Sequence, residues 1–114
     1  MGLIHREYLA SHRIYGCKKC RTHLTTIESM ISRTRSQAFN GQHGRAYLFD
    51  NVVNIKTGPP GDRAMTTGLH TVRDIYCVRC GETLGWKYDK AYEQTQKYKE
   101  GKFILERILL EDVQ

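Results

Sequence analysis

Four cysteines, arranged as two copies of a Cys-x2-Cys motif, constrain this chain more than any other feature of its sequence. The motifs are Cys17-Lys18-Lys19-Cys20 and Cys77-Val78-Arg79-Cys80, and they use every cysteine present. Each motif puts two sulfurs on one tight turn, and two such turns supply the four ligands that a tetrahedral zinc ion binds at about 2.3 Å. The sequence therefore predicts one structural zinc ion bound by Cys17, Cys20, Cys77 and Cys80.

Disulfide formation and redox catalysis are the competing uses of paired cysteines. Residues 1–12 hold no apolar run long enough for a signal peptide, which predicts a reducing compartment, cytoplasm or nucleus, where disulfides are rare. A redox dithiol normally occurs once, at the start of a helix, whereas both motifs here follow strand-like residues. Both patterns favour zinc.

The spacing between the motifs indicates the length of chain that the zinc ion links into one domain. Between Cys20 and Cys77 lie 56 residues, more than a small finger needs and enough for a domain clamped at two ends. A cross-link over such a loop contributes about 4 kcal/mol if a metal bridge behaves as a disulfide does. We expect one domain at residues 13–110, between a polar arm (1–12) and a frayed acidic tail (111–114).

Strand-like segments dominate the chain. We expect strands at 13–16, 65–67, 69–76, 83–88 and 102–109, and a hairpin of 46–49 with 52–55. Residues 23–32 suit either a strand or a short helical turn, and 33–44 suit an exposed loop. A turn is expected at 58–62, and a short helix or ordered loop at 89–100, anchored to the sheet by Tyr92 and Tyr98. The fold class is therefore mostly β.

The positive charge is concentrated near the first motif. Of the formal net charge of +6, residues 1–36 carry seven Lys or Arg against two Glu. Lys18, Lys19 and Arg21 either compensate the dianionic zinc tetrathiolate or form a basic surface for a partner, which leaves nucleic acid as an alternative ligand.

Catalytic chemistry has little support in the sequence. A thiol-dependent enzyme needs a nucleophilic cysteine apart from the metal, and there is no fifth cysteine. Of the five histidines, only His23 lies close to a motif, where we expect it to be a hydrogen-bond partner. The aromatic residues Trp86, Tyr88, Tyr47 and Phe49 have two interpretations: they belong to the core, or they line a groove for a peptide or small ligand.

A longer pattern resembles a known family. Gly44-x3-Leu48-x5-Asn54-x13-Gly68-x8-Cys77-x2-Cys80-x4-Gly85-Trp86-Lys87-Tyr88-x10-Lys99-x6-Glu106 is similar to the Yippee (Yippee-like) signature from about Tyr15 to Glu106. One departure is visible, because 23 residues separate Cys20 from Gly44 where the commonest Yippee pattern has nineteen. The extra residues fall around positions 33–39, in the expected loop and away from the zinc motifs.

The resemblance implies a β-tent, in which two antiparallel sheets meet at a steep angle and one zinc ion joins the two motifs. It also implies a small zinc protein of the nucleus and cytoplasm, some relatives being linked to the GID/CTLH ubiquitin ligase. Because a zinc ion with four cysteine ligands keeps no open position for water or substrate, we expect an adaptor that binds protein partners. Neither a membrane nor a small-molecule substrate is expected. The β-tent fold also occurs in the ligand-binding domain of cereblon, but a fold does not specify an activity.

Overall fold

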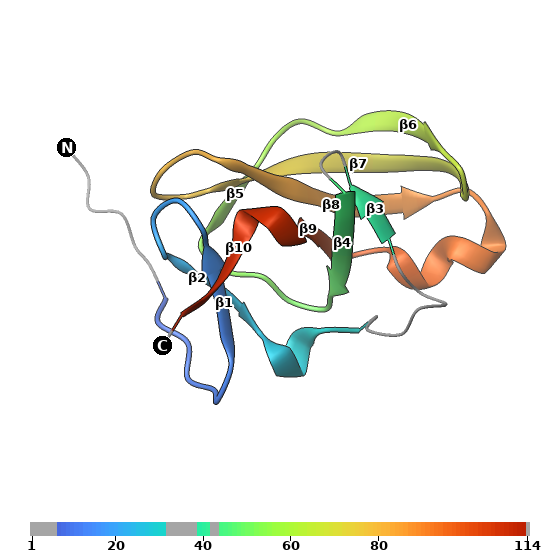
Figure 1. Ribbon diagram of the computed structural model, residues 1–114. Helices are drawn as coiled ribbons and strands as arrows, with labels where there is room; N and C mark the ends of the chain where they lie inside the picture. The colour runs from blue at the N-terminus through green and yellow to red at the C-terminus, as the bar shows by residue number, and fades with distance from the viewer. Residues whose placement is uncertain (1–6, 32–38, 42–43, 114) are drawn as a thin grey trace.

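The regular secondary structure is mainly β-strand, as a computed structural model shows, in which residues 7–31, 39–41 and 44–113 are described (Figure 1). Three short 3₁₀ helices of the described residues are η1 (Ile27–Ser29), η3 (Gln94–Lys99) and η4 (Arg107–Leu109). The strands are β1 (Ile14–Cys17), β2 (His23–Thr26), β3 (Phe39–Gly41), β4 (Gly44–Phe49), β5 (Ile55–Thr57), β6 (Gly61–Met65), β7 (Gly68–Cys77), β8 (Thr83–Ala91), β9 (Phe103–Glu106) and β10 (Leu110–Val113).

The strands form two antiparallel sheets. A three-stranded sheet has the order β10-β1-β2, and a seven-stranded sheet has the order β3-β4-β9-β8-β7-β5, with β6 also paired to β7. The predicted mostly β class with two antiparallel sheets is thus confirmed. Among the described residues, no helix combines the length and apolar composition needed to cross a membrane.

Residues 110–113 belong to the smaller sheet, in contrast to the predicted frayed tail at 111–114. Strand β10 pairs with β1 from Cys17↔Leu110 to Ile14↔Val113, and Val113 is buried. Figure 1 shows β10 in red beside β1 in blue. The expected single strand over 102–109 is also wrong in its second half, because η4 interrupts it and turns the chain from one sheet to the other.

The predicted hairpin of 46–49 with 52–55 is wrong. Strand β4 pairs with β3 and β9, and β5 pairs with β7 at the opposite edge of the same sheet. The two valines of the connection pack and bond toward the small sheet: Val52 is buried, and Val53 N–H donates to the Leu24 carbonyl at 2.8 Å. Asn54 then turns the chain in the left-handed region, at φ 59°.

Two further predictions need correction. The expected exposed loop 33–44 contains β3, which pairs with β4, although residues 32–38 and 42–43 lie outside the described part. The segment 89–100 does contain a short helix, η3, and Tyr92, although exposed, contacts the sheet as predicted, with its hydroxyl 3.1 Å from Thr71 Oγ1 of β7. Tyr98 is exposed and does not provide the second predicted anchor. The side chain that η3 buries is Lys99. The undecided stretch 23–32 contains both alternatives, a strand (β2) followed by a helical turn (η1).

The larger sheet is apolar on both faces, because neighbouring residues of one strand belong to different core clusters. The first cluster lies between the sheets and includes Tyr15 and Leu24 of the small sheet with Phe49 of the large one. The second cluster belongs to the large sheet alone and contains Ala46, Leu48, Val72, Tyr88 and Ile104. The first cluster also includes Cys17 and Cys77, so the candidate metal site lies at the end of the core that joins the sheets.

Candidate metal centre

The two Cys-x2-Cys motifs form turns of the same hydrogen-bonded design, which we call knuckles 1 and 2. Knuckle 1 (Cys17–Arg21) follows the end of β1, and knuckle 2 (Cys77–Gly81) follows the end of β7. In each, the last residue is left-handed, at φ 64° for Arg21 and 78° for Gly81, and its N–H donates to the carbonyl of the first cysteine. The N–H of the first cysteine donates in turn to the carbonyl of Thr22 or Glu82. This geometry directs both sulfurs of a knuckle to one side.

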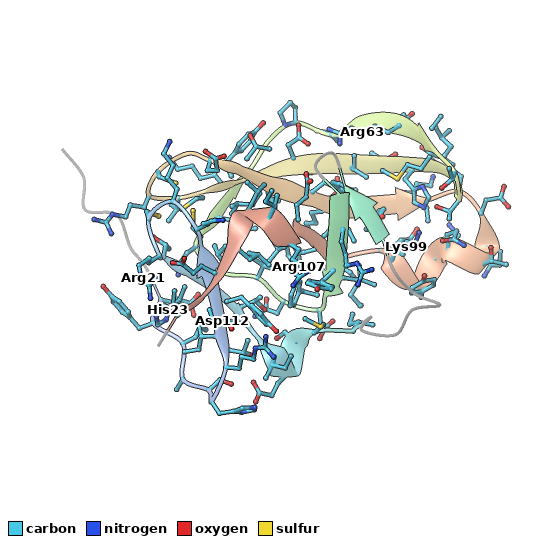
Figure 2. All side chains as sticks on the ribbon, viewed as in Figure 1. Arg21, His23, Arg63, Lys99, Arg107 and Asp112 are labelled. Carbon is cyan, nitrogen blue, oxygen red and sulfur yellow. The ribbon has the colours of Figure 1, made fainter. Side chains whose placement is uncertain are left out.

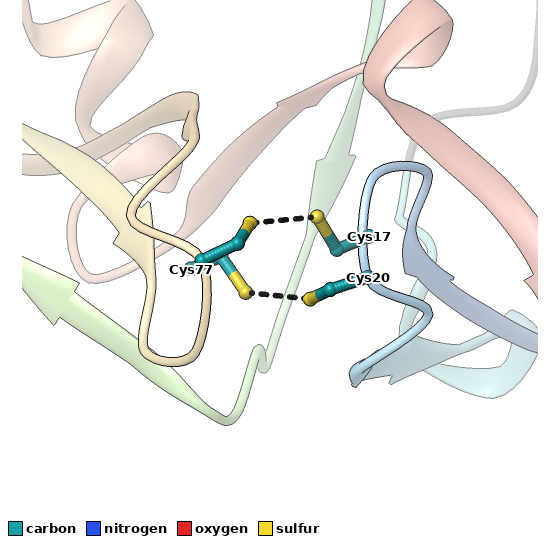
Figure 3. Close-up of side chains that lie close together, drawn as sticks. Cys17, Cys20 and Cys77 are labelled. Atoms are coloured by element: carbon teal, nitrogen blue, oxygen red, sulfur yellow. Dashed lines mark hydrogen bonds between the residues drawn. The ribbon is translucent and has the colours of Figure 1, made fainter.

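The four sulfurs converge between the knuckles (Figure 3). Cys17 Sγ lies 3.6 Å from Cys80 Sγ, and Cys20 Sγ lies 3.4 Å from Cys77 Sγ. All four ligand atoms lie within 4.8 Å of one another. A tetrahedral zinc ion with Zn–S bonds of about 2.3 Å places its sulfurs about 3.8 Å apart, which matches this cluster.

Electrostatics also favours a dication at this site. Burial raises the pKa of the Cys17 thiol to about 12, and it raises the pKa of Cys77 as well. Burial acts on Cys20 in the same direction, but hydrogen bonding from Thr22, 3.1 Å away, lowers its pKa to about 7. Four thiolates this close would repel one another, and zinc removes that cost because it binds the ionised form. The four cysteines therefore fit a single structural zinc ion with no open coordination position.

His23 contacts the N-terminal arm. Its Nδ1 accepts a hydrogen bond from Leu9 N–H at 3.0 Å, and its ring meets Tyr8 edge-on at 5.7 Å. Its backbone carbonyl accepts a hydrogen bond from the Asn54 side chain at 2.6 Å. His23 is thus a hydrogen-bond partner, as the sequence predicts.

The cations predicted as a basic surface differ in their partners. Lys19 Nζ lies 3.8 Å from a carboxylate oxygen of Glu82, and Arg21 pairs with Glu111. Lys18 is exposed and pairs with no carboxylate among the residues that the structure describes. Knuckle 1 is therefore joined by ion pairs to Glu82, the residue after knuckle 2, and to β10, and Lys18 retains an uncompensated charge.

The four aromatic residues do not form one common wall. Phe49 is buried in the first cluster with Tyr47 packed against it, whereas Tyr88 is buried in the second cluster with Trp86 packed against it. Two of the four, Phe49 and Tyr88, are core residues with at most 1% of their surface exposed. Of this set, Tyr47 alone borders the groove described below.

Two features escaped the sequence analysis. His70 of β7 and Lys99 of η3 are buried, and Lys99 Nζ lies 3.3 Å from Thr67 Oγ1 and 5.4 Å from the Tyr88 ring centre. Lys99 is one of the residues of the Yippee pattern, and this could have indicated a structural role for it. A second feature is a groove beside β10 whose cations, Arg13, Arg45 and Arg107, come from three distant segments. No local pattern brings these together.

Comparison with known proteins agrees with the metal-centre geometry. Residues 13–114 match the family described as "Yippee zinc-binding/DNA-binding /Mis18, centromere assembly". A putative yippee-like protein of rice is 50% identical over 115 aligned positions, which cover 94% of this chain and 93% of the relative. Human protein yippee-like 4 is 53% identical over 102 positions, covering 89% of this chain and 77% of the relative.

The fold comparison extends to a more distant protein. The crystal structure of a Mis18 "Yippee-like" domain superposes with a TM-score of 0.69, covering 90% of this chain and 95% of that one. Sequence identity to that domain is 15%, so this similarity concerns the fold alone.

Proposed function

The chain belongs to the Yippee-Mis18 family, and from that premise we propose that it is a zinc-stabilised adaptor that binds other proteins and catalyses no reaction of its own. The observation that carries this proposal is the closed cysteine cluster. All four cysteines of the sequence supply sulfurs to one site, and the cluster occupies the end of the core that joins the two sheets. A zinc ion with four sulfur ligands has no position for water or substrate, so its role is to hold the fold together.

The partner that we propose is a ubiquitin-ligase assembly of the GID/CTLH type, and the compartments are nucleus and cytoplasm. Support for both comes from the resemblance to Yippee proteins and from identities of 50% or more to curated yippee-like proteins over most of the chain. The cysteine motifs agree with a reducing compartment, where thiolates stay available for metal.

Affinity capture from native extract, followed by mass spectrometry, tests the adaptor role. The bait is the full zinc-loaded chain, and nuclease treatment separates protein partners from those that depend on nucleic acid. We expect ubiquitin-ligase subunits to co-purify after nuclease treatment and to bind again as purified proteins. Recovery of no partner that rebinds in purified form would overturn the proposal.

An assay with methionine sulfoxide tests the non-catalytic part of the proposal. With dithiothreitol as reductant, the zinc-loaded protein should give no reduction above background, because each thiol is a metal ligand. Reduction above background by the zinc-loaded protein, lost in a cysteine variant that still binds zinc, would contradict it.

A nucleic-acid-binding role is the second candidate, favoured by the formal charge of +6 and by the words "DNA-binding" in the family description. It predicts binding to duplex or single-stranded oligonucleotides that weakens steeply as salt concentration rises. Affinity capture of protein partners that persists as the salt concentration rises would favour the adaptor role.

A further inference from the structure

A groove of about 350 Å³ lies between β10 on one side and β4 and η4 on the other. One wall comes from the small sheet through Arg13, Tyr15 and Asp112, and the other from Arg45, Tyr47 and Arg107. Figure 2 labels Arg107 and Asp112 on these two parts of the molecule. The volume is at the lower end of the range of about 300–1,000 Å³ that is typical of ligand sites.

The groove carries uncompensated positive charge. Arg13 pairs with Asp112 at 3.6 Å, and Glu111 pairs with Arg21, so the carboxylates of β10 already have partners. Arg45 and Arg107 are exposed and have no carboxylate partner among the residues that the structure describes. A continuation of the groove, also about 350 Å³, adds Lys18 and the exposed Ile108. The free charges of the groove therefore favour an anionic partner.

The backbone of β10 offers a second means of recognition. In an antiparallel pair, residues alternate between hydrogen-bonded and non-bonded positions. Lys18 N–H donates to the Leu109 carbonyl, so by alternation Gly16/Glu111 and Ile14/Val113 are bonded pairs. The Asp112 N–H and carbonyl then point away from β1. Because β10 pairs with β1 alone within the described chain, this edge can accept another strand.

We propose that the groove binds an extended acidic peptide segment, which adds to β10 as a strand and directs aspartate, glutamate or phosphoserine side chains to Arg45 and Arg107. The proposal rests on the adaptor function and specifies the chemistry of the partner. Arginine suits carboxylate and phosphate equally, because its planar fork donates two parallel hydrogen bonds. Tyr47, Ile108 and Leu110 supply apolar contact for the residues between the acidic ones.

A peptide fits this groove better than a nucleic acid does. The phosphate backbone of a nucleic acid has no repeating N–H and carbonyl groups of the kind that a strand presents, so it cannot pair with the open edge of β10. A peptide pairs with a strand edge through its own N–H and carbonyl groups, and only alternate side chains need a negative charge.

Fluorescence anisotropy with the full zinc-loaded chain tests the proposal. The probe is a fluorescein-labelled peptide in which glutamate alternates with threonine. Companion peptides carry phosphoserine or glutamine in place of glutamate, and one carries N-methyl groups on alternate backbone nitrogens. Comparison of the phosphoserine and glutamate peptides distinguishes phosphate from carboxylate as the source of negative charge. The N-methylated peptide lacks the N–H groups needed for strand pairing, so it measures how much that pairing contributes to binding.

Matched charge reversals locate the binding surface. Arg45→Glu and Arg107→Glu remove groove charges, and Lys56→Glu reverses an exposed charge on β5, at the far edge of the large sheet. Each groove variant should weaken peptide binding by about tenfold or more, and Lys56→Glu by less than about twofold. Melting temperatures of all three variants equal to that of the wild type would show that folding is unchanged.

Several outcomes would overturn the proposal. These are equal binding of the glutamate and glutamine peptides, equal loss in all three variants, or undiminished binding of the N-methylated peptide. Tighter binding of an oligonucleotide of matched charge, lost in the same arginine variants, would assign the groove to nucleic acid. If no peptide binds while protein partners still co-purify with both groove variants, the groove assignment fails and the adaptor function stands.

Discussion

The last residue of each knuckle lies in the same left-handed conformation, but one position holds arginine and the other glycine. Arg21 has φ 64° and Gly81 has φ 78°, and each N–H closes the turn onto the first cysteine. A residue with a Cβ atom is disfavoured in this region by about 1 kcal/mol, whereas glycine is not. Nothing lies within 4 Å of a Cβ atom built on Gly81, so a substitution there changes backbone preference and little else.

Gly81→Ala should therefore lower the free energy of unfolding by about 1 kcal/mol, and Arg21→Gly should be more stable than Arg21→Ala by a similar amount. The comparison with Arg21→Ala is needed because both Arg21 variants lose the exposed ion pair with Glu111. Urea unfolding of the zinc-loaded proteins measures all three changes. If Gly81→Ala has the same free energy of unfolding as the wild type, this account of the knuckle is refuted.

A buried histidine makes stability depend on pH. Burial lowers the pKa of His70, whose side chain is fully buried and whose Nδ1 lies 3.0 Å from the Gly68 carbonyl. The folded chain thus keeps His70 neutral while the unfolded chain takes up a proton below a pH of about 6.5. Stability should then fall as pH decreases below that value, by at most about 1.4 kcal/mol per pH unit from this group.

A His70→Gln variant isolates this contribution, because zinc release in acid affects both proteins alike. We expect the difference in unfolding free energy between wild type and variant to narrow between pH 7.5 and pH 5, measured by urea denaturation. Parallel pH profiles of the two proteins would show that His70 does not titrate on unfolding.

At the scale of elements, β10 shows how a charged segment can join a sheet and bury one side chain, Val113. Val113 is 2% exposed, and a Cβ atom placed on Gly16 would lie 3.0 Å from Val113 Cγ2, so the glycine gives the valine its space. Val113→Ala should lower the free energy of unfolding by about 2 kcal/mol, because it leaves a cavity against β1. Thermal unfolding of this variant, beside an Asp112→Asn control on the exposed face, measures the effect. Equal melting temperatures would mean that β10 adds nothing to the core.

These elements also show which parts of the fold could be predicted from the sequence. The cysteine spacing predicts both knuckles, since a Cys-x2-Cys turn is a local structure that its own residues determine. Strand pairing is not local: Val52 and Val53 predict burial and extended structure, but they carry no information that β5 pairs with Cys77 and not with β4. The charges of Glu111 and Asp112 predict exposure, although their backbone completes a sheet with residues almost a hundred positions away.

The groove was missed for the same physical reason. Arg45 and Arg107 are isolated basic residues in strand and helical-turn segments, and neither has a basic neighbour in sequence. Pairing of β4 with β9, which η4 follows, brings them to one groove. Charge counts along the chain point instead to Lys18, Lys19 and Arg21, two of which are neutralised by ion pairs.

At the scale of the whole molecule, the metal joins the two sheets. Cys17 ends β1 of the small sheet and Cys77 ends β7 of the large one, and both are buried in the cluster of apolar residues between the sheets. The binding energy of such a zinc site, on the order of 10–16 kcal/mol, is as large as the net stability of a typical domain, about 5–15 kcal/mol. The second cluster, within the large sheet, is a smaller core that has no contribution from the small sheet.

Removal of zinc should therefore unfold the domain and not only open one end of it. Elemental analysis of the reduced protein should give one zinc per chain, and a strong chelator or Cys77→Ser should abolish the cooperative thermal transition and most of the β-sheet circular dichroism. Arg79→Ala, at an exposed position of the same knuckle, is the matched control and should unfold like the wild type. The physical reason is that loss of the ion leaves buried thiols without a partner and frees the small sheet, whose apolar residues are buried only in the cluster shared with the large sheet. A metal-free protein with native circular dichroism and an unchanged melting temperature would show that the apolar clusters suffice, and that the zinc ion serves something other than the fold.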